Sequence, residues 1–435
     1  MISNDELDVT PTEVASVGRG VGPVRRFVRN LGPGLITGAA DDDPSGISTY
    51  ATAGASFGYG LLWTAWVSLP LMAAVQLMCA RIGLVSGRGL ANVLRRYYAR
   101  PILWFACTLL LVANVVNIAA DLGGMAEAME LLTGLDSLWF HLPFAVLMIA
   151  LLVFTSYRTI ANTFKWLTLV LVAYVIAAFL AHPNWSAVLR ASVRPPLNFS
   201  QDYLTTLVAI LGTTISPYLF FWQAAQEVEE GESGRTRTVG PRVGATMQEL
   251  RAARTDTVAG MSFSNLIMYF IILTTGATLY VHGQRDIETA RQAAEALRPL
   301  AGEAAYVLFA LGLIGTGMLG VPVLAGSAAY TVSEAFAWRG GMNERPRLAP
   351  RFYAVIALSM TAGLLLDYVG VSAIKMLFWS AVLNGLLAPP LIVIILLICN
   401  NRQVMGEHVN GLWLNLLGTG AALVMFIAGI VMFVN

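Results

Sequence analysis

The sequence predicts an all-α membrane protein in which two consecutive five-helix repeats of opposite topology are followed by one extra helix. Composition is the first reason: 57% of the 435 residues are hydrophobic and 12% are charged, with a mean hydropathy of +0.67, which is too apolar for a soluble globule. The second is a series of eleven apolar runs, each long enough to cross a bilayer as a helix. The third is a pair of interruptions at corresponding places in the two five-run blocks.

The predicted spans form a single transmembrane domain over residues 31–434, preceded by a polar tail at 1–30. Repeat one covers about 31–182, repeat two about 200–399, and the extra helix about 411–434. The spans are expected at 31–57, 60–84, 101–131, 138–156, 160–181, 200–226, 257–281, 304–337, 350–366, 371–399 and 411–434.

Basic residues alternate between successive connections. The tail and every second connection after it hold twenty Lys and Arg residues, whereas the intervening connections hold only Arg190, Arg194, Arg285, Arg291 and Arg298. Because positive charge is retained in the cytoplasm, the N-terminus is predicted to be cytoplasmic. With an odd number of spans, the C-terminus lies outside the cell membrane.

Proline interrupts two of the spans. The first breaks at Asp43-Pro44 and the sixth at Ser216-Pro217. A proline removes a backbone donor and pushes the preceding residue out of the α region. One such kink is typical of an ordinary transmembrane helix, but two at corresponding positions indicate an inverted-repeat transporter whose site lies between two discontinuous helices. Unwound backbone at that depth is tolerated where protein buries it or where it lines a water-filled cavity.

Three consecutive carboxylates, Asp41, Asp42 and Asp43, lie at the first break. An ionised Asp in the middle of a span costs about 2.5–3.5 kcal/mol, so it normally has a partner. Neither break contains Lys, Arg or His, which points to a cation from solution as that partner. Asp43 directly precedes the proline and is the predicted main ligand, with capping of a half-helix as the alternative. For Asp41 and Asp42, lining the approach, capping and hydrogen bonding to a neighbour all remain open.

The other polar groups at the breaks supply oxygen only. They are unwound carbonyls and the hydroxyls of Ser45, Thr213, Thr214, Ser216 and Tyr218. Oxygen ligands suit Mg²⁺, Ca²⁺ or Mn²⁺, while sulfur and imidazole favour later transition metals. Mg²⁺ usually keeps several waters and meets one or two carboxylates, so a single carboxylate in a roomy polar cavity fits it.

Several stretches, spread over about residues 31–430, form a recognisable set. They are Gly32-Pro33-Gly34, Asp43-Pro44-Ser45-Gly46, Gly54-Ala55-x-Phe57-Gly58-Tyr59-x-Leu61-Leu62-Trp63, Ala120-Asp121-Leu122, Ile210-Leu211-Gly212 to Pro217, Asp256-Thr257 and Asn401-Arg402-Gln403-Val404-Met405-Gly406. Together they resemble the natural resistance-associated macrophage proteins (NRAMP), which are divalent-metal transporters with the leucine-transporter fold.

The chain departs from the family pattern at the predicted site. The family's Asp-Pro-Gly-Asn has Gly46 in place of Asn, and its Met-Pro-His reads Ser216-Pro217-Tyr218. Gly124 stands where the family has an acidic residue three places after the third-span Asp. The soft ligand and two proton-transfer groups are thus missing, a pattern similar to the NRAMP-related magnesium transporters. The resemblance also implies that the carbonyls of Ala40 and Thr213 join Asp43 around the ion, with Asn384 as a further polar candidate.

Two other acidic positions keep alternative interpretations. Glu227, in the run Gln226 to Glu230 after the sixth span, is either part of a solvated helix end or a collector of cations near the inner mouth. Asp121 is either a cavity residue or a hydrogen-bonded structural group.

We therefore expect a transporter that imports Mg²⁺, and Mn²⁺ with it, by alternating access and without proton coupling. In this hypothesis Ser45, Gly46 and Ser216 shape a wide site around Asp43. The alternatives are a proton-coupled Mn²⁺/Fe²⁺ importer of the ordinary NRAMP type, a sodium-coupled carrier of small solutes, and an ion-binding membrane sensor. An enzyme is not expected, because no nucleophile–base pair or paired metal motif is found. The expected partners are the metal ion and the lipid bilayer, with no cofactor and no nucleic acid, and a monomer is compatible with the sequence.

Overall fold

Every regular element in the described part of the chain is a helix. The computed structural model describes residues 33–157, 159–160, 163, 169–196, 200–233, 244–368 and 372–434, and these ranges contain no strand. The predicted tail at 1–30 and part of the predicted fifth span, residues 161–162 and 164–168, lie outside the described residues.

The helices follow the predicted order of spans. Most of the longer ones are α4 (Trp63–Ser86), α6 (Arg100–Thr133), α7 (Leu138–Phe154), α13 (Met247–Thr275), α16 (Ala305–Ala335), α17 (Pro350–Asp367), α18 (Ala373–Cys399) and α20 (Leu412–Val434). Shorter helices are α5 (Leu90–Tyr97), α9 (Val172–Leu180), α10 (Trp185–Val193), α14 (Ala290–Ala294), α15 (Arg298–Ala301) and α19 (Arg402–Met405). A π-helical turn at Gly276–Tyr280 extends α13.

Both predicted interruptions are confirmed. The first span is divided into α2 (Pro33–Asp41) and α3 (Pro44–Phe57), and the sixth into α11 (Gln201–Thr214) and α12 (Pro217–Ser233). In each case the second half begins with proline at its first position, where the missing N–H is not needed and the fixed φ suits the helix.

Seven helical stretches in the described ranges are long and apolar enough to cross a membrane, by length and composition. They are Trp63–Ser86, Arg100–Thr133, Gln201–Gly231, Met247–Tyr280, Ala290–Ala335, Ala373–Cys399 and Leu412–Val434. The first predicted span falls short because its break leaves helices of 9 and 14 residues. The fourth corresponds to the shorter apolar helix Leu138–Phe154.

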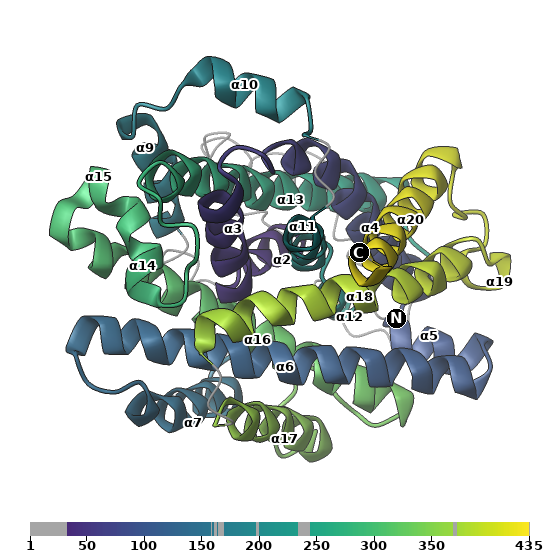
Figure 1. Ribbon diagram of the computed structural model, residues 1–435. Helices are drawn as coiled ribbons and strands as arrows, with labels where there is room; N and C mark the ends of the chain where they lie inside the picture. Colours follow the sequence, from purple (N-terminus) through teal and green to yellow (C-terminus); the bar gives the residue numbers. More distant parts are fainter. Residues whose placement is uncertain are drawn as a thin grey trace, which may run out of the picture.

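The broken helices occupy the middle of the bundle. In Figure 1, α2, α3 and α11 lie at the centre, α6 runs along one side with α7 and α17 beyond it, and α20 lies at the edge. Helix α2 packs against α13 and α12, while α3 packs against α11, α13 and α18. Half-helices from the two breaks are therefore neighbours.

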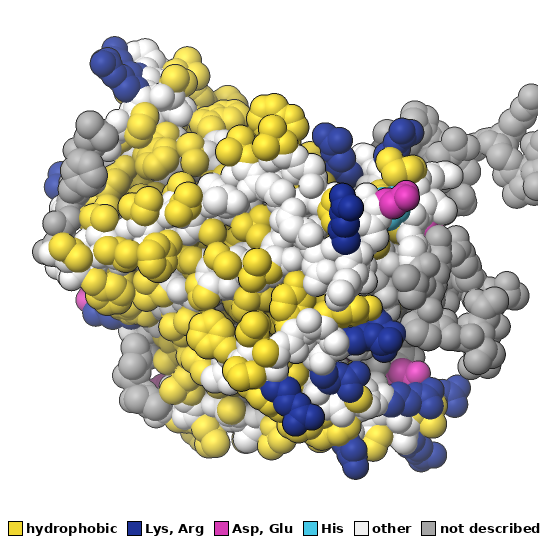
Figure 2. Space-filling model, turned by 90° about the vertical axis from the view of Figure 1, so that its right-hand side faces the viewer, with side chains coloured by type: hydrophobic (Ala, Val, Ile, Leu, Met, Phe, Trp, Pro, Cys, Tyr) yellow, Lys and Arg dark blue, Asp and Glu magenta, His cyan; other side chains and the backbone are white. Residues whose placement is uncertain are grey.

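The outer surface is suited to lipid. Figure 2 shows a broad hydrophobic area on one face, with Lys and Arg side chains gathered toward its margins. Large apolar side chains are exposed along α20, among them Trp413 (73%), Phe426 (58%) and Phe433 (73%). Such an apolar exterior fits a multi-pass membrane protein.

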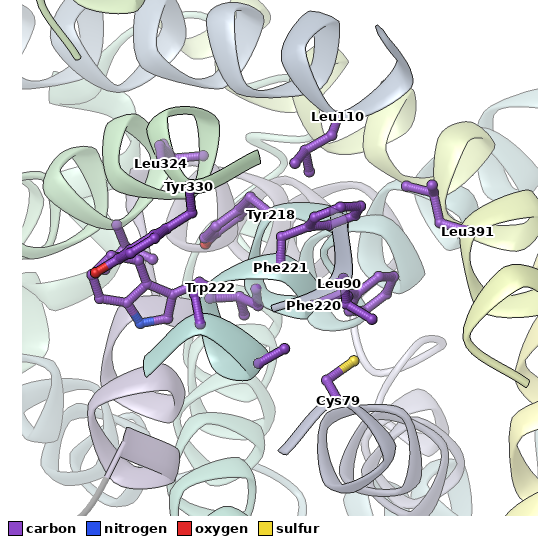
Figure 3. Close-up of a cluster of buried hydrophobic side chains, with 14 of the residues drawn as sticks. Cys79, Leu90, Leu110, Tyr218, Phe220, Phe221, Trp222, Leu324, Tyr330 and Leu391 are labelled. Atoms are coloured by element: carbon purple, nitrogen blue, oxygen red, sulfur yellow. The ribbon is translucent and has the colours of Figure 1, made fainter. Parts of the chain in front are cut away.

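Aromatic packing fixes α12 inside the protein. Figure 3 shows Tyr218, Phe220, Phe221 and Trp222 within one hydrophobic cluster that also includes Tyr330 of α16. The rings of Trp222 and Tyr330 meet edge-on with centroids 5.9 Å apart. Because these side chains are fully or nearly fully buried, the start of α12, including Tyr218, is held in a defined place.

Candidate ion-binding site

At the first break, Asp43 caps helix α3. Its backbone is extended (φ −70°, ψ 173°), and Pro44 follows as the first helical residue. Its Oδ1 accepts hydrogen bonds from the Ser45 hydroxyl at 2.6 Å and the Gly46 amide at 2.8 Å. The predicted capping role is thus present. Capping uses Oδ1, so it leaves Oδ2 directed to other partners.

At the second break, Ser216 hydrogen-bonds to carbonyls at the end of helix α11. Helix α11 ends before Ile215 (φ −118°, ψ 60°), and α12 begins at Pro217. The Ser216 hydroxyl donates to the carbonyls of Gly212 at 3.0 Å and Thr213 at 2.7 Å. These carbonyls belong to the last turn of α11, where intrahelical partners run out. The predicted ligands Ser216 and Thr213 are therefore hydrogen-bonded to each other in this structure.

The two breaks meet through Tyr218. Its hydroxyl lies 3.0 Å from the carbonyl oxygen of Ala40 and 3.1 Å from Oδ2 of Asp43. One proton is thus shared between two of the predicted ion ligands. On the same side, a Cβ at Gly46 would lie 3.2 Å from Oγ1 of Thr213, so the absent side chain leaves room between the breaks.

Asp121 faces the first break from α6. A Cβ at Gly320 of α16 would lie 3.1 Å from Cβ of Asp43 and 3.5 Å from Oδ2 of Asp121, which places the two acidic side chains on either side of that glycine. Asp121 is fully buried, and neither of its carboxylate oxygens has a hydrogen-bond partner. Gly124, one turn further along α6, lies beside Pro44.

Asp41 and Asp42 point to helix α13. The Ser264 hydroxyl lies 2.7 Å from Oδ2 of Asp41 and 3.0 Å from Oδ1 of Asp42. Both aspartates are buried, with exposed fractions of 0% and 1%. Hydrogen bonding to a neighbour, one of the predicted roles, is therefore observed for both.

Among the described residues, Asn384 makes no hydrogen bond to the aspartates or hydroxyls at the two breaks. Its amide forms a reciprocal pair with Asn117 of α6, at 2.9 and 3.0 Å. Both side chains are fully buried, and each satisfies the other. The amide atoms of Asn384 thus connect α18 to α6.

For Glu227, the prediction of a solvated helix end is wrong. Its exposed fraction is 7%, and it accepts a hydrogen bond of 2.9 Å from Gln223. The reason is that α12 continues to Ser233, well beyond the predicted end at 226, and packs against α4. A Cβ at Gly83 of α4 would lie 3.0 Å from Cβ of Glu227.

The side chains at the site offer oxygen ligands, and their carboxylates make the local electrostatic potential negative. None of the ion pairs found in the described part of the chain involves Asp41, Asp42, Asp43 or Asp121. No group of three or more His, Cys, Asp or Glu side chains converges there either. A cation at Asp43 would therefore be held by one or two carboxylates together with neutral oxygens and water, as Mg²⁺ usually is.

Sequence reasoning missed several residues that build the site. Ser264 is a single hydroxyl in α13, and Gly320 is one glycine among many in α16, so neither carries a local signal. Asn117 was detectable in principle, because an amide within an apolar span requires a partner. Tyr218 was among the hydroxyls expected at the breaks, but its direct contact with Asp43 carried no signal in the sequence.

Comparisons with known proteins show what this chain is similar to as a whole. A 29% identical relative over 396 residues, covering 89% of this chain and 85% of its own, is the divalent metal cation transporter MntH of Deinococcus radiodurans. MntH of Pectobacterium carotovorum is 27% identical over 397 residues, covering 89% and 90%. A crystal structure of the Eremococcus coleocola manganese transporter has a TM-score of 0.75 at 19% identity, covering 94% of this chain and 87% of that one. Mhp1, a nucleobase-cation-symport-1 family transporter, has a TM-score of 0.56 at 16% identity, covering 93% and 91%.

The structural likenesses support the fold of a helical membrane transporter. The relatives are transporters by name, in agreement with the prediction of a transporter and not an enzyme. The family model described as natural resistance-associated macrophage protein-like matches residues 34–435. Since this match spans nearly the entire chain, the protein belongs to the natural resistance-associated macrophage protein-like (Nramp) family.

Proposed function

We propose that this protein imports divalent metal cations, Mg²⁺ and also Mn²⁺, by alternating access and without proton coupling. The observation that carries the proposal is the contact between the two breaks, where Tyr218 touches both Asp43 and the Ala40 carbonyl. It places a buried carboxylate, helix-end carbonyls and hydroxyls in one space. Similarity to the MntH transporters supports divalent cations as the substrate class.

The architecture proposed for this function is eleven spans arranged as two inverted five-helix repeats and an extra helix. The matching breaks in α2–α3 and α11–α12, and the packing of these half-helices on one another, support it. The alternation of basic connections in the sequence supports a cytoplasmic N-terminus and an external C-terminus.

Preference for a hard ion follows from the atoms around Asp43. Ser216 and Tyr218 present hydroxyls where the resemblance expects a thioether and an imidazole. Oxygen ligands hold Mg²⁺ and Mn²⁺ readily and give no special affinity to Cd²⁺. Gly124 beside Pro44 provides no acidic group for proton transfer.

Proton-coupled import of Mn²⁺ or Fe²⁺ is the second candidate. It is favoured by Asp121, a buried carboxylate without a hydrogen-bond partner next to Asp43. Sodium-coupled solute transport has only the fold likeness to Mhp1 in its favour.

Uptake into proteoliposomes tests the proposed substrate. Flux of Mg²⁺, Mn²⁺, Cd²⁺ and Ca²⁺ is compared for the wild type, Asp43→Asn and the control Asp202→Asn. Asp202 lies exposed in the first turn of α11. The proposal expects Mg²⁺ and Mn²⁺ uptake by the wild type and the control, and loss of both in Asp43→Asn. Full uptake by Asp43→Asn would overturn it.

A further inference from the structure

Asp41 and Asp42 form a second acidic centre that the Asp43 site does not use. Both carboxylates are buried and share one donor, the Ser264 hydroxyl. Their other oxygens, Oδ1 of Asp41 and Oδ2 of Asp42, have no hydrogen-bond partner. Two carboxylates that meet at one hydroxyl repel each other unless a proton or a cation lies between or beside them.

A separate side chain points to a ligand in the same space. The hydroxyl of Tyr50 is buried, with an exposed fraction of 0%, and has no hydrogen-bond partner. At Gly46, a Cβ would lie 3.3 Å from the ring of Tyr50 and 3.4 Å from the carbonyl of Asp41. A buried hydroxyl normally has a hydrogen-bond partner, so an unpartnered one this close to the first break leaves a donor for an ion's water.

This centre lies on the face of α2 that meets α12 and α13. Asp41, Thr37 and Gly34 are spaced by four and three residues, which places them on one side of the helix. Thr37 donates to Gln223 of α12 at 2.5 Å, and the Gly34 amide donates to Asp256 of α13 at 2.6 Å. Gly38 and Gly260 bring the two backbones into close approach between these contacts. Polar groups therefore continue from the break toward the N-terminal end of α2.

We propose that Asp41, Asp42 and Ser264 form a second divalent-cation position, next to the Asp43 site on the α2 side, with the Tyr50 hydroxyl contacting the ion through water. A divalent ion balances both carboxylates, whereas a monovalent ion leaves one charge uncompensated in a buried place. Two carboxylates with hydroxyls and water are ligands that Mg²⁺ and Mn²⁺ accept. The inference rests on the proposed transport of such ions. A cation that leaves Asp43 would bind next at this second position.

Binding stoichiometry tests the second position separately from transport. Mn²⁺ is titrated calorimetrically into the purified full chain in detergent, and Mg²⁺ is used as a competitor. We expect two Mn²⁺ ions for the wild type, one for the Asp41→Asn/Asp42→Asn variant and one for Asp43→Asn. One ion for the wild type that persists in the double variant would overturn the inference while leaving the Asp43 site in place. Two ions retained by the double variant would overturn it as well.

A measurement on the wild-type protein keeps the inference testable even where the double variant fails to fold. Two Mn²⁺ ions held by neighbouring carboxylates broaden each other's electron paramagnetic resonance lines. We expect this broadening in the wild type at saturating Mn²⁺ and its loss in Asp43→Asn, which keeps only the Asp41/Asp42 ion. Sharp lines from the saturated wild type would contradict two adjacent positions. Loss of all Mn²⁺ binding in Asp43→Asn would also contradict the inference, because the second centre would then hold no ion of its own.

Discussion

Removing the Tyr218 hydroxyl is expected to tighten ion binding. In the structure this hydroxyl is hydrogen-bonded to two oxygens that are proposed ion ligands, Oδ2 of Asp43 and the carbonyl of Ala40. Tyr218→Phe removes that competitor and keeps the ring in its buried aromatic cluster. The substitution removes a hydrogen bond from the ion-free state. In the ion-bound state the ion has displaced the hydroxyl, so the substitution removes no interaction there.

The size of the effect follows from the hydrogen-bond geometry. A hydrogen bond to a charged group contributes about 1.5–3 kcal/mol. The lower end applies, because one proton is shared and the 3.1 Å separation from Asp43 exceeds that of a strong bond from a hydroxyl to a carboxylate. A loss of about 1.5 kcal/mol in the ion-free state corresponds to roughly tenfold tighter binding.

Calorimetric titration of Mg²⁺ and Mn²⁺ into purified protein measures this change. Tyr174→Phe is the matched control, since that tyrosine is also buried, and its hydroxyl has no hydrogen-bond partner. Its Kd should equal that of the wild type. If Tyr218→Phe binds either ion more weakly than the wild type, the hydroxyl is a ligand and the reasoning is refuted.

Three further substitutions test the surroundings of the site. Gly320→Ala adds a methyl group 3.1 Å from Cβ of Asp43, so ion affinity measured by the same titration should fall severalfold. The control Gly312→Ala, whose added methyl group has its nearest neighbour at 3.7 Å, should leave the affinity unchanged. Gly38→Ala places a methyl group into the backbone of α13 and should destabilise the protein by about 1–3 kcal/mol, seen as a lower Tm than for the control Gly420→Ala; equal Tm values would contradict the close packing. Ser216→Cys introduces a soft ligand of similar size and should raise Cd²⁺ uptake relative to Mn²⁺ uptake, and an unchanged ratio would place this side chain outside the ion's reach.

The breaks could be predicted from sequence because their cause is local. Proline lacks an N–H and restricts the residue before it, so Pro44 and Pro217 fix where the second half-helices begin. Asp43 was predictable for the same reason, since a carboxylate before proline at the start of a helix can cap it. The expected pairing of the two breaks needed only their matching positions in the two predicted five-span blocks.

Contacts between distant segments could not be derived in this way. Tyr218 and Asp43 are 175 residues apart, and Ser264 is separated from Asp41 by 223. Which hydroxyl reaches which carboxylate depends on helix rotation and on side-chain packing. The burial of Glu227 was missed for a different reason, because a charged run after an apolar span resembles a helix end although α12 continues through it.

Mg²⁺ uptake recorded together with internal pH distinguishes uncoupled from proton-coupled transport. Proteoliposomes containing the wild type are supplied with Mg²⁺ in the presence and absence of an inward proton gradient, and the same traces are taken with Mn²⁺ and Cd²⁺. We expect Mg²⁺ to enter without internal acidification and at a rate that the gradient does not change. Entry of Mn²⁺ or Cd²⁺ that requires the gradient, with Mg²⁺ excluded, would contradict a hard and uncoupled site built on Asp43 and Ser216.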